Sequence, residues 1–244
     1  MELSGKAALV TGGAVRVGRA LSLALAREGM RVVVGYGRSD AAARALVAEI
    51  RAEGGEAVAL GADLARTEEV ERLAREAEAA FGGVDVLVNN ASVFPAEGVE
   101  ETDPALWDHT LAVNLRAPFF LTQHLAPGMR ARGGGAVVNL ADLAGLQPWR
   151  GYAAHAVSKA GLVHLTKVAA RSLAPEVRVN AIAPGTVLPP EDFPEEEVRR
   201  LAERAPLRRN GSPGDVVEAL LYLLRADFVT GEVLVVDGGR MLRA

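Results

Sequence analysis

Residues 7–26 read AALVTGGAVRVGRALSLALA, and this stretch decides the fold. Its pattern predicts a short apolar strand over 7–10, a glycine-bearing turn over 11–18 and then a helix with an apolar stripe. A strand, a tight turn and a helix in this order form the opening unit of a dinucleotide-binding sheet.

The glycines of this turn suit a bound phosphate. Gly12, Gly13 and Gly18 allow the backbone to turn and to come close to a phosphate, and the N–H groups that begin the helix favour an anion there. The spacing departs from G-x-G-x-x-G, because Arg16 stands where a middle glycine often lies. A tight βα turn with an arginine that only reaches solvent is the alternative interpretation.

The composition excludes several classes of protein. The 244 residues, half of them apolar, fit one domain over 1–244 with a large core. A net charge of −4 gives no basic field for nucleic acid, and no apolar run is long enough to cross a membrane. The chain has no cysteine, and we expect no metal site. The first strand leaves no room for a signal peptide, so we expect a cytoplasmic protein.

Beyond residue 30, strand-like and helix-like segments alternate to the end of the chain. Predicted strands occupy 31–35, 57–61, 84–89, 135–140, 178–183 and 232–237. Predicted helices occupy 40–53, a segment from 67 with a stripe of Val70, Leu73, Ala77 and Ala80, then 104–129, 151–173, a short helix after the loop 184–197, and a helix that starts at 212–215. Ser39 and Thr67 are expected helix caps, and Ser212 with Asp215 resembles a capping box. We therefore predict a single-domain α/β fold, a Rossmann-type doubly wound parallel sheet of about seven strands with helices on both faces.

Ligands of such sheets bind beyond the carboxyl ends of the strands, so the polar residues there are candidates. The second strand is followed by Tyr36-Gly37-Arg38-Ser39, with no acidic residue to bind the ribose 2′-hydroxyl of NAD. Arg38 and Ser39, with Arg16, can instead hold a 2′-phosphate through charge-assisted hydrogen bonds. Two solvated arginines are the alternative.

The next two strands also end in polar residues. Asp63 can accept a hydrogen bond from an adenine amino group or can cap the next turn. Asn89 and Asn90 close the fourth strand, where their amides can bridge strand ends and a cofactor ribose. Phe94 follows, and a core aromatic is the commoner role of a phenylalanine.

A third group of polar residues follows the fifth strand. Asp142 lies just past its end, and the next helix carries His155 and Lys159 four positions apart, hence on one face. An acid, an imidazole and an ammonium around a reactive ring can form a proton-transfer set. Each of the three residues alone is more often structural.

Five motifs in order resemble the classical short-chain dehydrogenases/reductases over nearly the whole chain. They are Thr11-Gly12 with Gly18, Asn89-Asn90-Ala91, Ser158-Lys159, Pro184-Gly185 and Val236-Asp237-Gly238-Gly239. Within that family the chain is most similar to pteridine reductases. The residues that match this subgroup are Arg16, Tyr36-x-Arg38-Ser39, Asn89-Asn90-Ala91-Ser92-x-Phe94, Asn139-x-x-Asp142, Gln147-Pro148 and Gly151-Tyr152.

The resemblance implies an NADP(H) cofactor that lies over residues 12–18, with a 2′-phosphate at Arg16, Arg38 and Ser39. The implied cofactor-binding residues are Gly12, Arg16, Val17, Gly18, Tyr36, Arg38, Ser39, Asp63, Leu64, Asn89, Ala91, Ser92, Lys159, Pro184 and Gly185. Asp63 and Leu64 would face the adenine, and Asn89 and Ala91 would line the ribose.

The resemblance also implies a substrate site and an assembly. The implied catalytic residues are Asp142, His155, Lys159 and Asn114, and the implied substrate-binding residues are Ser92, Phe94, Asp142 and His155. Lys159 would hold the nicotinamide ribose and lower the pKa of the proton donor, and Asn114 would support a water chain to it. A flat pterin would lie between the Phe94 ring and the nicotinamide, under a mobile loop at 184–193. The chain would form a homotetramer through the helix at 151–173 and the strand at 232–237.

One position departs from the family pattern. The active-site tyrosine four residues before the lysine is His155 here, and Tyr152 is a flanking residue that the subgroup also carries. The sequence thus favours an NADPH-dependent reductase of a dihydropterin, dihydrofolate or similar flat substrate. The alternatives are a carbonyl reductase of another ketone and an NADP-binding protein with weak or no catalysis.

Overall fold

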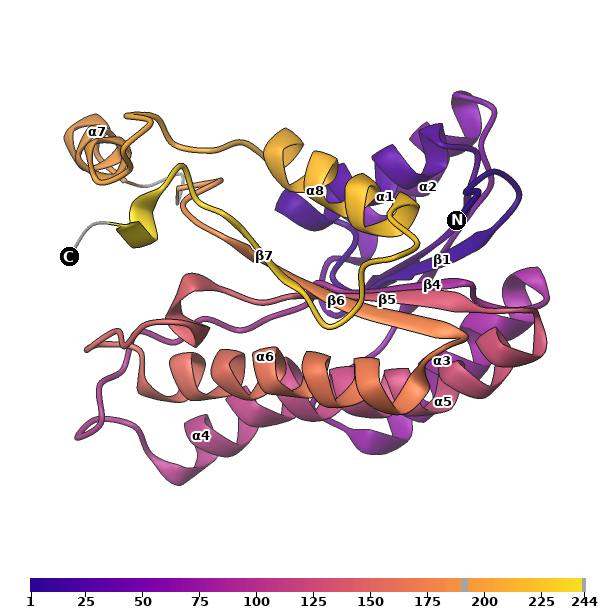
Figure 1. Cartoon of the computed structure of the whole chain (residues 1–244), viewed down its shortest axis with the longest axis horizontal. Coiled ribbons are helices and arrows are strands. Elements are labelled where there is room, and N and C mark those ends of the chain that lie inside the picture. The colour runs from indigo at the N-terminus through magenta and orange to yellow at the C-terminus, as the bar shows by residue number, and fades with distance from the viewer. Residues whose placement is uncertain (190–192, 243–244) are drawn as a thin grey trace.

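A computed structural model describes residues 1–189 and 193–242, and its strands form one parallel sheet (Figure 1). The strands are β1 (Ala7–Val10), β2 (Arg31–Tyr36), β3 (Ala57–Gly61), β4 (Val86–Asn89), β5 (Gly135–Leu140), β6 (Val177–Pro184) and β7 (Val233–Val236). Their order across the sheet is β3-β2-β1-β4-β5-β6-β7. The order reverses between β1 and β4, which places the topological switch point at the ends of these two strands.

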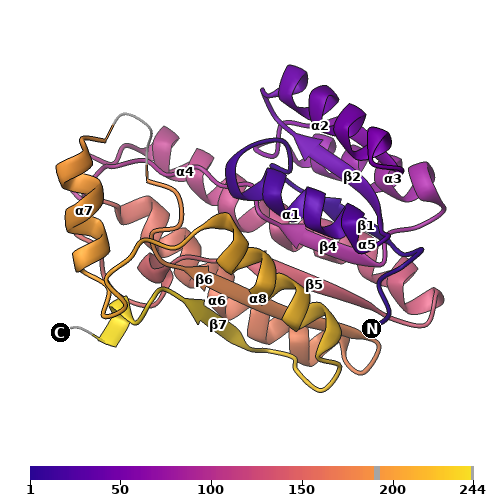
Figure 2. The same cartoon turned by 90° about the horizontal axis from the view of Figure 1, so that it is seen from above.

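Helices cover both faces of the sheet (Figures 1 and 2). One face carries α1 (Arg16–Arg27), α2 (Asp40–Ala52) and α8 (Pro213–Arg225). The other carries α3 (Thr67–Phe81), α5 (Ala117–Ala131) and α6 (Ala153–Leu173), with α4 (Pro104–Leu111) beside α6. A π-helical turn, η1 (Ala112–Arg116), joins α4 to α5, and two 3-10 turns are η2 (Leu143–Gly145) and η3 (Arg240–Leu242). Helix α7 (Glu195–Glu203) lies at the end of the molecule beyond β6, on the left of both figures.

The core consists of one apolar layer on each face of the sheet. Val32 and Val34 pack with Leu21 of α1 on one face, while Val33 packs with Leu73 of α3 on the other. Successive strand residues point to opposite faces, so a strand covered on both sides must be apolar throughout. This requirement explains the continuous apolar runs that mark the strands in the sequence.

The predicted fold class is confirmed, including the number of strands. The segment 104–129, predicted as one helical region, is two helices joined by the π-turn η1. The capping box of Ser212 and Asp215 is present. Ser39 occupies the N-cap position of α2 as predicted, although its side chain makes no cap hydrogen bond. The predicted cap at Thr67 is wrong, since Thr67 lies inside α3 after Arg66. Ala80 of the predicted stripe is exposed, and Ala74 is buried in its place. Part of the predicted substrate loop, 190–192, lies outside the described residues.

The turn between β1 and α1 has no room for a side chain at Gly18. A Cβ at this position would collide with the carbonyl oxygen of Gly12 and with the Asn90 amide. We expect Gly18→Ala to lower the free energy of unfolding by about 1–3 kcal/mol, because the backbone must shift to relieve the overlap. Urea unfolding curves measure the change. In the control variant Gly151→Ala the new Cβ meets nothing within 4 Å, and equal losses in the two variants would contradict the explanation.

Candidate active site

The ends of β1 and β4 are held together by Thr11. Its Oγ1 donates to the carbonyl of Val88 at 3.3 Å and accepts the backbone N–H groups of Asn90 and Ala91 at 3.0 and 3.1 Å. The Asn90 amide donates in return to the carbonyls of Thr11 and Gly12, at 2.9 and 3.0 Å. The switch point of the sheet is therefore closed by side chains from both strands.

The glycine turn beside this junction contains residues with a left-handed backbone. Gly12 has a φ of +59°, and Arg16 also adopts a left-handed φ of +51°. The Arg16 guanidinium donates to the carbonyl of Leu188 at 2.7 Å. This contact directs Arg16 toward the segment after β6, so its assignment to a 2′-phosphate stays a prediction.

A cavity of about 430 Å³ opens at the carboxyl ends of β1 and β2. Its lining includes seven of the predicted cofactor residues, namely Gly12, Tyr36, Arg38, Asp63, Leu64, Ala91 and Ser92. The other predicted cofactor residues, Arg16, Val17, Gly18, Ser39, Asn89, Lys159, Pro184 and Gly185, are not part of this lining. Gly185 pairs with Val236 at the far strands instead, where its backbone N–H donates to the Val236 carbonyl at 2.9 Å.

The charges around this cavity suit a phosphate better than a hydroxyl donor. Arg38 is exposed and forms no ion pair within residues 1–189 and 193–242. The nearest carboxylate in sequence, Asp40, accepts from the Tyr36 hydroxyl at 2.6 Å and from Arg44 at 2.9 Å. These two hydrogen bonds, that of Tyr36 first, hold the pKa of Asp40 below its usual value. The carboxylate is engaged, and the free cation at this edge is Arg38.

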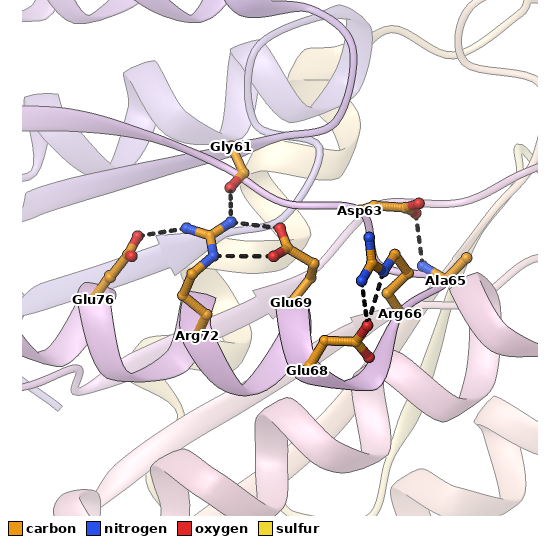
Figure 3. A network of polar contacts seen from close by, with 8 residues as sticks. All are labelled: Gly61, Asp63, Ala65, Arg66, Glu68, Glu69, Arg72 and Glu76. Carbon is orange, nitrogen blue, oxygen red and sulfur yellow. Dashed lines mark hydrogen bonds and ion pairs between the residues drawn. The ribbon is translucent and has the colours of Figure 1, made fainter.

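Asp63 stands at the start of a polar network that leads into α3 (Figure 3). Its carboxylate accepts the backbone N–H of Ala65 at 3.0 Å, so the capping alternative is realised. Arg72 donates to the carbonyl of Gly61 at 2.7 Å and also pairs with Glu69 and Glu76. The hydrogen bonds with the two glutamates raise the pKa of Arg72. The end of β3 is thereby tied to α3. A contact between Asp63 and adenine stays a prediction.

Amide side chains connect the ends of β4 and β5 to α6. Asn89 donates to the Asn139 amide oxygen at 2.8 Å, and Asn139 donates to the Thr166 hydroxyl at 2.9 Å. The Asn89 Oδ1 atom is buried and has no partner among the described residues. An unsatisfied buried acceptor of this kind can accept a hydroxyl from a ligand.

Lys159 is buried beside these strand ends. Its Nζ donates to the carbonyl of Leu140 at 2.7 Å, and its side chain is 3% exposed. Burial lowers the pKa of Lys159 to about 8, and the Asp142 carboxylate opposes that shift. The ammonium is therefore mostly charged at neutral pH, with two further N–H groups to donate.

Asn114 lies in the π-helical turn η1 and fixes the segment after β4. Its Oδ1 accepts from the backbone N–H of Val93 at 2.8 Å and from the Ser92 hydroxyl at 3.2 Å. Its Nδ2 donates to the Val93 carbonyl at 2.9 Å and to the Ser158 hydroxyl at 3.0 Å. Irregular π-turns are frequent at functional sites, and here the turn aims an amide at three residues.

His155 lies between Val93 and Asp142. Its Nδ1 is 3.1 Å from the Val93 carbonyl, which can only accept, so this nitrogen carries a hydrogen. Its Nε2 is 3.8 Å from Asp142 Oδ2 and has no hydrogen-bond partner among the described residues, although the ring is only 2% exposed. Without a further proton, Nε2 and the carboxylate would face each other as two acceptors. A proton on either atom would allow the two groups to attract each other.

An aromatic group borders the Asp142–His155 pair. The centre of the Phe94 ring lies 4.4 Å from the centre of the His155 ring, and the two ring planes are 79° apart. The ring centres of Tyr152 and Trp149 are 4.6 and 6.5 Å away, and Trp149 packs edge-on. Phe94 is 52% exposed, so its interpretation as a core residue is wrong. It stands in the extended segment after β4, where one side packs on these rings and the rest is open.

The sequence interpretation missed two parts of this site. The Val93 carbonyl is a main-chain group that no residue type signals. Trp149 lies in an irregular loop, and the only sequence signal for it as a site residue is a large aromatic side chain close to Pro148 and Gly151. Within the described ranges, no three His, Asp or Glu side chains gather as a metal site, and no helix is long and apolar enough to cross a membrane.

Comparisons with known proteins agree with this fold. The sequence model of the family described as "Enoyl-(Acyl carrier protein) reductase" matches residues 13–240. The 3-oxoacyl-[acyl-carrier-protein] reductase FabG of Staphylococcus epidermidis is 36% identical over 239 residues, which cover 96% of this chain and 98% of that protein. The L-rhamnose 1-dehydrogenase (NAD(P)(+)) of Azotobacter vinelandii is 38% identical over 250 residues, with 98% of each chain covered.

Two solved structures are similar along the whole chain. FolM alternative dihydrofolate reductase 1 from Brucella canis, complexed with NADP, has a TM-score of 0.94 and 33% identity over all of this chain and 96% of its own. The Brucella suis protein of the same description, also with NADP, has a TM-score of 0.94 and 34% identity over all of this chain and 98% of its own. With the parallel sheet and the glycine turn, these matches show that the chain belongs to the short-chain dehydrogenase/reductase family of oxidoreductases.

Proposed function

We propose that this protein is an NADPH-dependent reductase of a flat dihydropterin- or dihydrofolate-like substrate. The observation that carries the proposal is the exposed ring of Phe94 beside the Asp142–His155 pair. An aromatic surface next to an imidazole and a carboxyl group suits a planar heterocycle whose C=N bond is reduced, because either group can carry the proton that the reduction needs. The 0.94 TM-score to two dihydrofolate reductases of the FolM type supports this substrate class.

The residues at the switch point fit NADP(H). Gly12 and Gly18 let the turn pack closely on Asn90 and Ala91, and the N–H groups that begin α1 beside this turn would hold a pyrophosphate. Arg38 at the cavity edge would hold the 2′-phosphate, with Ser39 beside it, and the unpartnered Asn89 Oδ1 would accept a ribose hydroxyl. NADPH, when bound, supplies the hydride.

In this proposal His155 and Asp142 provide the proton. The Val93 carbonyl keeps Nδ1 protonated, so the proton to be donated would lie on Nε2 or on Asp142 Oδ2, at the edge next to Phe94. The substrate takes that proton as the hydride arrives, and the pair recovers it from water. Asn114 is a positioning residue, since it holds Val93 and thereby the tautomer of His155. A water chain from Asn114 to Lys159 is part of the proposal.

Lys159 binds and orients rather than donates. Its ammonium would hold the nicotinamide ribose with the N–H groups that Leu140 does not use. Its positive charge also favours release of a proton from a nearby acid. With a pKa of about 8, this charge is lost in mildly alkaline solution.

A carbonyl substrate is the second candidate. The 36% identity to a 3-oxoacyl-[acyl-carrier-protein] reductase favours it, because the same hydride and proton reduce a ketone. NADPH oxidation by the purified protein against dihydropterins, dihydrofolate and simple ketones separates the two candidates. Turnover of ketones alone would exclude the pterin proposal. Binding of NADPH without turnover of any substrate would instead favour a cofactor-binding protein without this catalysis.

The position of Arg38 predicts a preference for NADPH. We expect NADPH to bind more tightly than NADH by roughly 1–3 kcal/mol, the contribution of a few charge-assisted hydrogen bonds. Arg38→Gln should remove most of this difference while NADH affinity changes little. Fluorescence titration of both cofactors measures it, with Arg75→Gln on the exposed side of α3 as the control for charge. An unchanged NADPH affinity in Arg38→Gln would contradict the assignment.

The role of His155 predicts a dependence on pH. A proton-donating imidazole gains its proton as pH falls, so activity should rise from about pH 8 to 6. His155→Phe should lower kcat by about 100-fold or more. His155→Tyr should retain or gain activity and flatten this slope, because the ordinary pKa of tyrosine is near 10. Steady-state rates of the three proteins over this range provide the measurement.

A second limb of the same profile belongs to Lys159. Loss of its positive charge above about pH 8 should lower activity in wild type and in His155→Tyr alike, so this limb is the internal control. If wild type and His155→Phe turn over every substrate equally, His155 is not the acid. Asp142 or water would then be the donor.

Assembly into four copies is also part of the proposal. Strand β7 is the edge of the sheet, and exposed apolar side chains, Val235 on the strand with Tyr222 and Phe228 nearby in sequence, remain uncovered among the described residues. With α6, this edge is the expected contact between copies. Light scattering should give about four times the 25.6 kDa chain mass, and the mass of a single chain at micromolar concentration would refute it.

A further inference from the structure

Arg240 is held in a fixed position at the end of β7. It begins the turn η3, and Asp237 caps this turn by accepting the backbone N–H groups of Gly239 and Met241, both at 2.7 Å. Gly238 and Gly239 adopt left-handed φ values of +63° and +84°, which allow the chain to reverse there. The base of the Arg240 side chain is therefore fixed by the backbone.

The guanidinium of Arg240 extends from this turn to the border of the substrate site. Its Nη1 donates to the Thr186 hydroxyl at 2.8 Å, and its Cζ lies 5.5 Å from the centre of the Trp149 ring. Trp149 in turn contacts Phe94 and Tyr152, with ring centres 6.5 and 5.8 Å away. Trp149 thus connects the cation to the aromatic surface on which the flat substrate is proposed to lie.

The charge of Arg240 has no carboxylate partner in the part of the chain that the structure describes. No ion pair within 4.0 Å involves it, and both oxygens of the neighbouring Asp237 are taken by backbone N–H groups. Burial, and then the positive charge of Arg204, lower the pKa of Arg240, while Asp142 and Asp237 oppose the shift. A guanidinium remains protonated at neutral pH, so an unpaired positive charge stands here.

A cavity of about 480 Å³ lies next to this charge. Arg240 and Thr186 line it, together with Asn210, Gly211 and Leu242. The cavity offers room for a substituent beside the Arg240 guanidinium. Four of the five N–H groups of the guanidinium have no hydrogen-bond acceptor among the described residues, which leaves its planar fork free.

We infer that Arg240 binds a carboxylate on the side chain of the substrate and selects flat rings that carry an acidic tail over those that do not. The inference rests on the proposed reductase function and adds to it the residue that makes this selection. The fork matches a carboxylate with two parallel hydrogen bonds. Phe94 contacts His155 on one side and Trp149 on another, and Arg240 contacts Trp149. A substrate ring that lies on Phe94 would therefore extend its tail along Trp149 toward Arg240.

The test compares two ligands that differ only in charge. Folic acid and its dimethyl ester are titrated by calorimetry into protein saturated with NADP⁺, so that no hydride is transferred. Wild type should bind the acid at least about tenfold more tightly than the ester. Arg240→Gln should lower the affinity for the acid about tenfold and leave the ester unchanged, and Arg240→Lys, which keeps the charge without the fork, should fall between. Arg75→Gln on α3 should change neither affinity.

The outcomes separate this inference from the reductase function. Equal binding of acid and ester by wild type, or an unchanged affinity for the acid in Arg240→Gln, would overturn the inference. Failure of both ligands to bind would overturn the inference together with the proposed pterin substrate. The expected affinities without turnover of dihydrofolate would support the acid-binding role and contradict the reductase function.

Discussion

The hydroxyl of Thr11 is the interaction on which the rest of the site depends. It holds the end of β1 to the segment that leaves β4, at the one place in the sheet where the strand order reverses. From this junction the chain runs directly through Ser92 and Val93 to Phe94. The same junction therefore determines where a dinucleotide can lie and where the aromatic surface and the Val93 carbonyl stand. The cofactor side and the substrate side share one anchor.

Most of the fold could be predicted from the sequence, because it follows from local patterns. The apolar runs of β1 and β5, the glycine turn and the capping box at Ser212 each report a constraint within a few residues. Ser39 is at the predicted N-cap position but makes no cap hydrogen bond, and Thr67 lies one residue inside its helix, because a capping residue type does not guarantee the side-chain geometry. No sequence pattern indicates the π-turn at Asn114, because one extra residue in a helical turn leaves the apolar stripe of the helix nearly unchanged.

The candidate site was less predictable than the fold. Asp142, His155 and Lys159 were placed together from their spacing, and the structure brings Asp142 and His155 within 3.8 Å. The contact of the Arg16 side chain with Leu188 was not predictable. The direction of this side chain depends on the left-handed backbone of Arg16, which the local sequence does not reveal. The Val93 carbonyl was invisible for the same reason. Main-chain atoms decide the tautomer of His155, and they carry no residue signature.

The burial of Lys159 has a consequence for the stability of the whole chain. Its pKa in the folded state is about 8, whereas its ordinary value is 10.5. Below pH 8 the ammonium is charged in both states, and keeping it inside the fold costs roughly 3 kcal/mol. Between pH 8 and the ordinary value, the unfolded chain binds a proton that the folded chain has released, so stability rises with pH over this window. The buried Lys159 therefore destabilises the fold most in the pH range where its positive charge is available to bind a ligand.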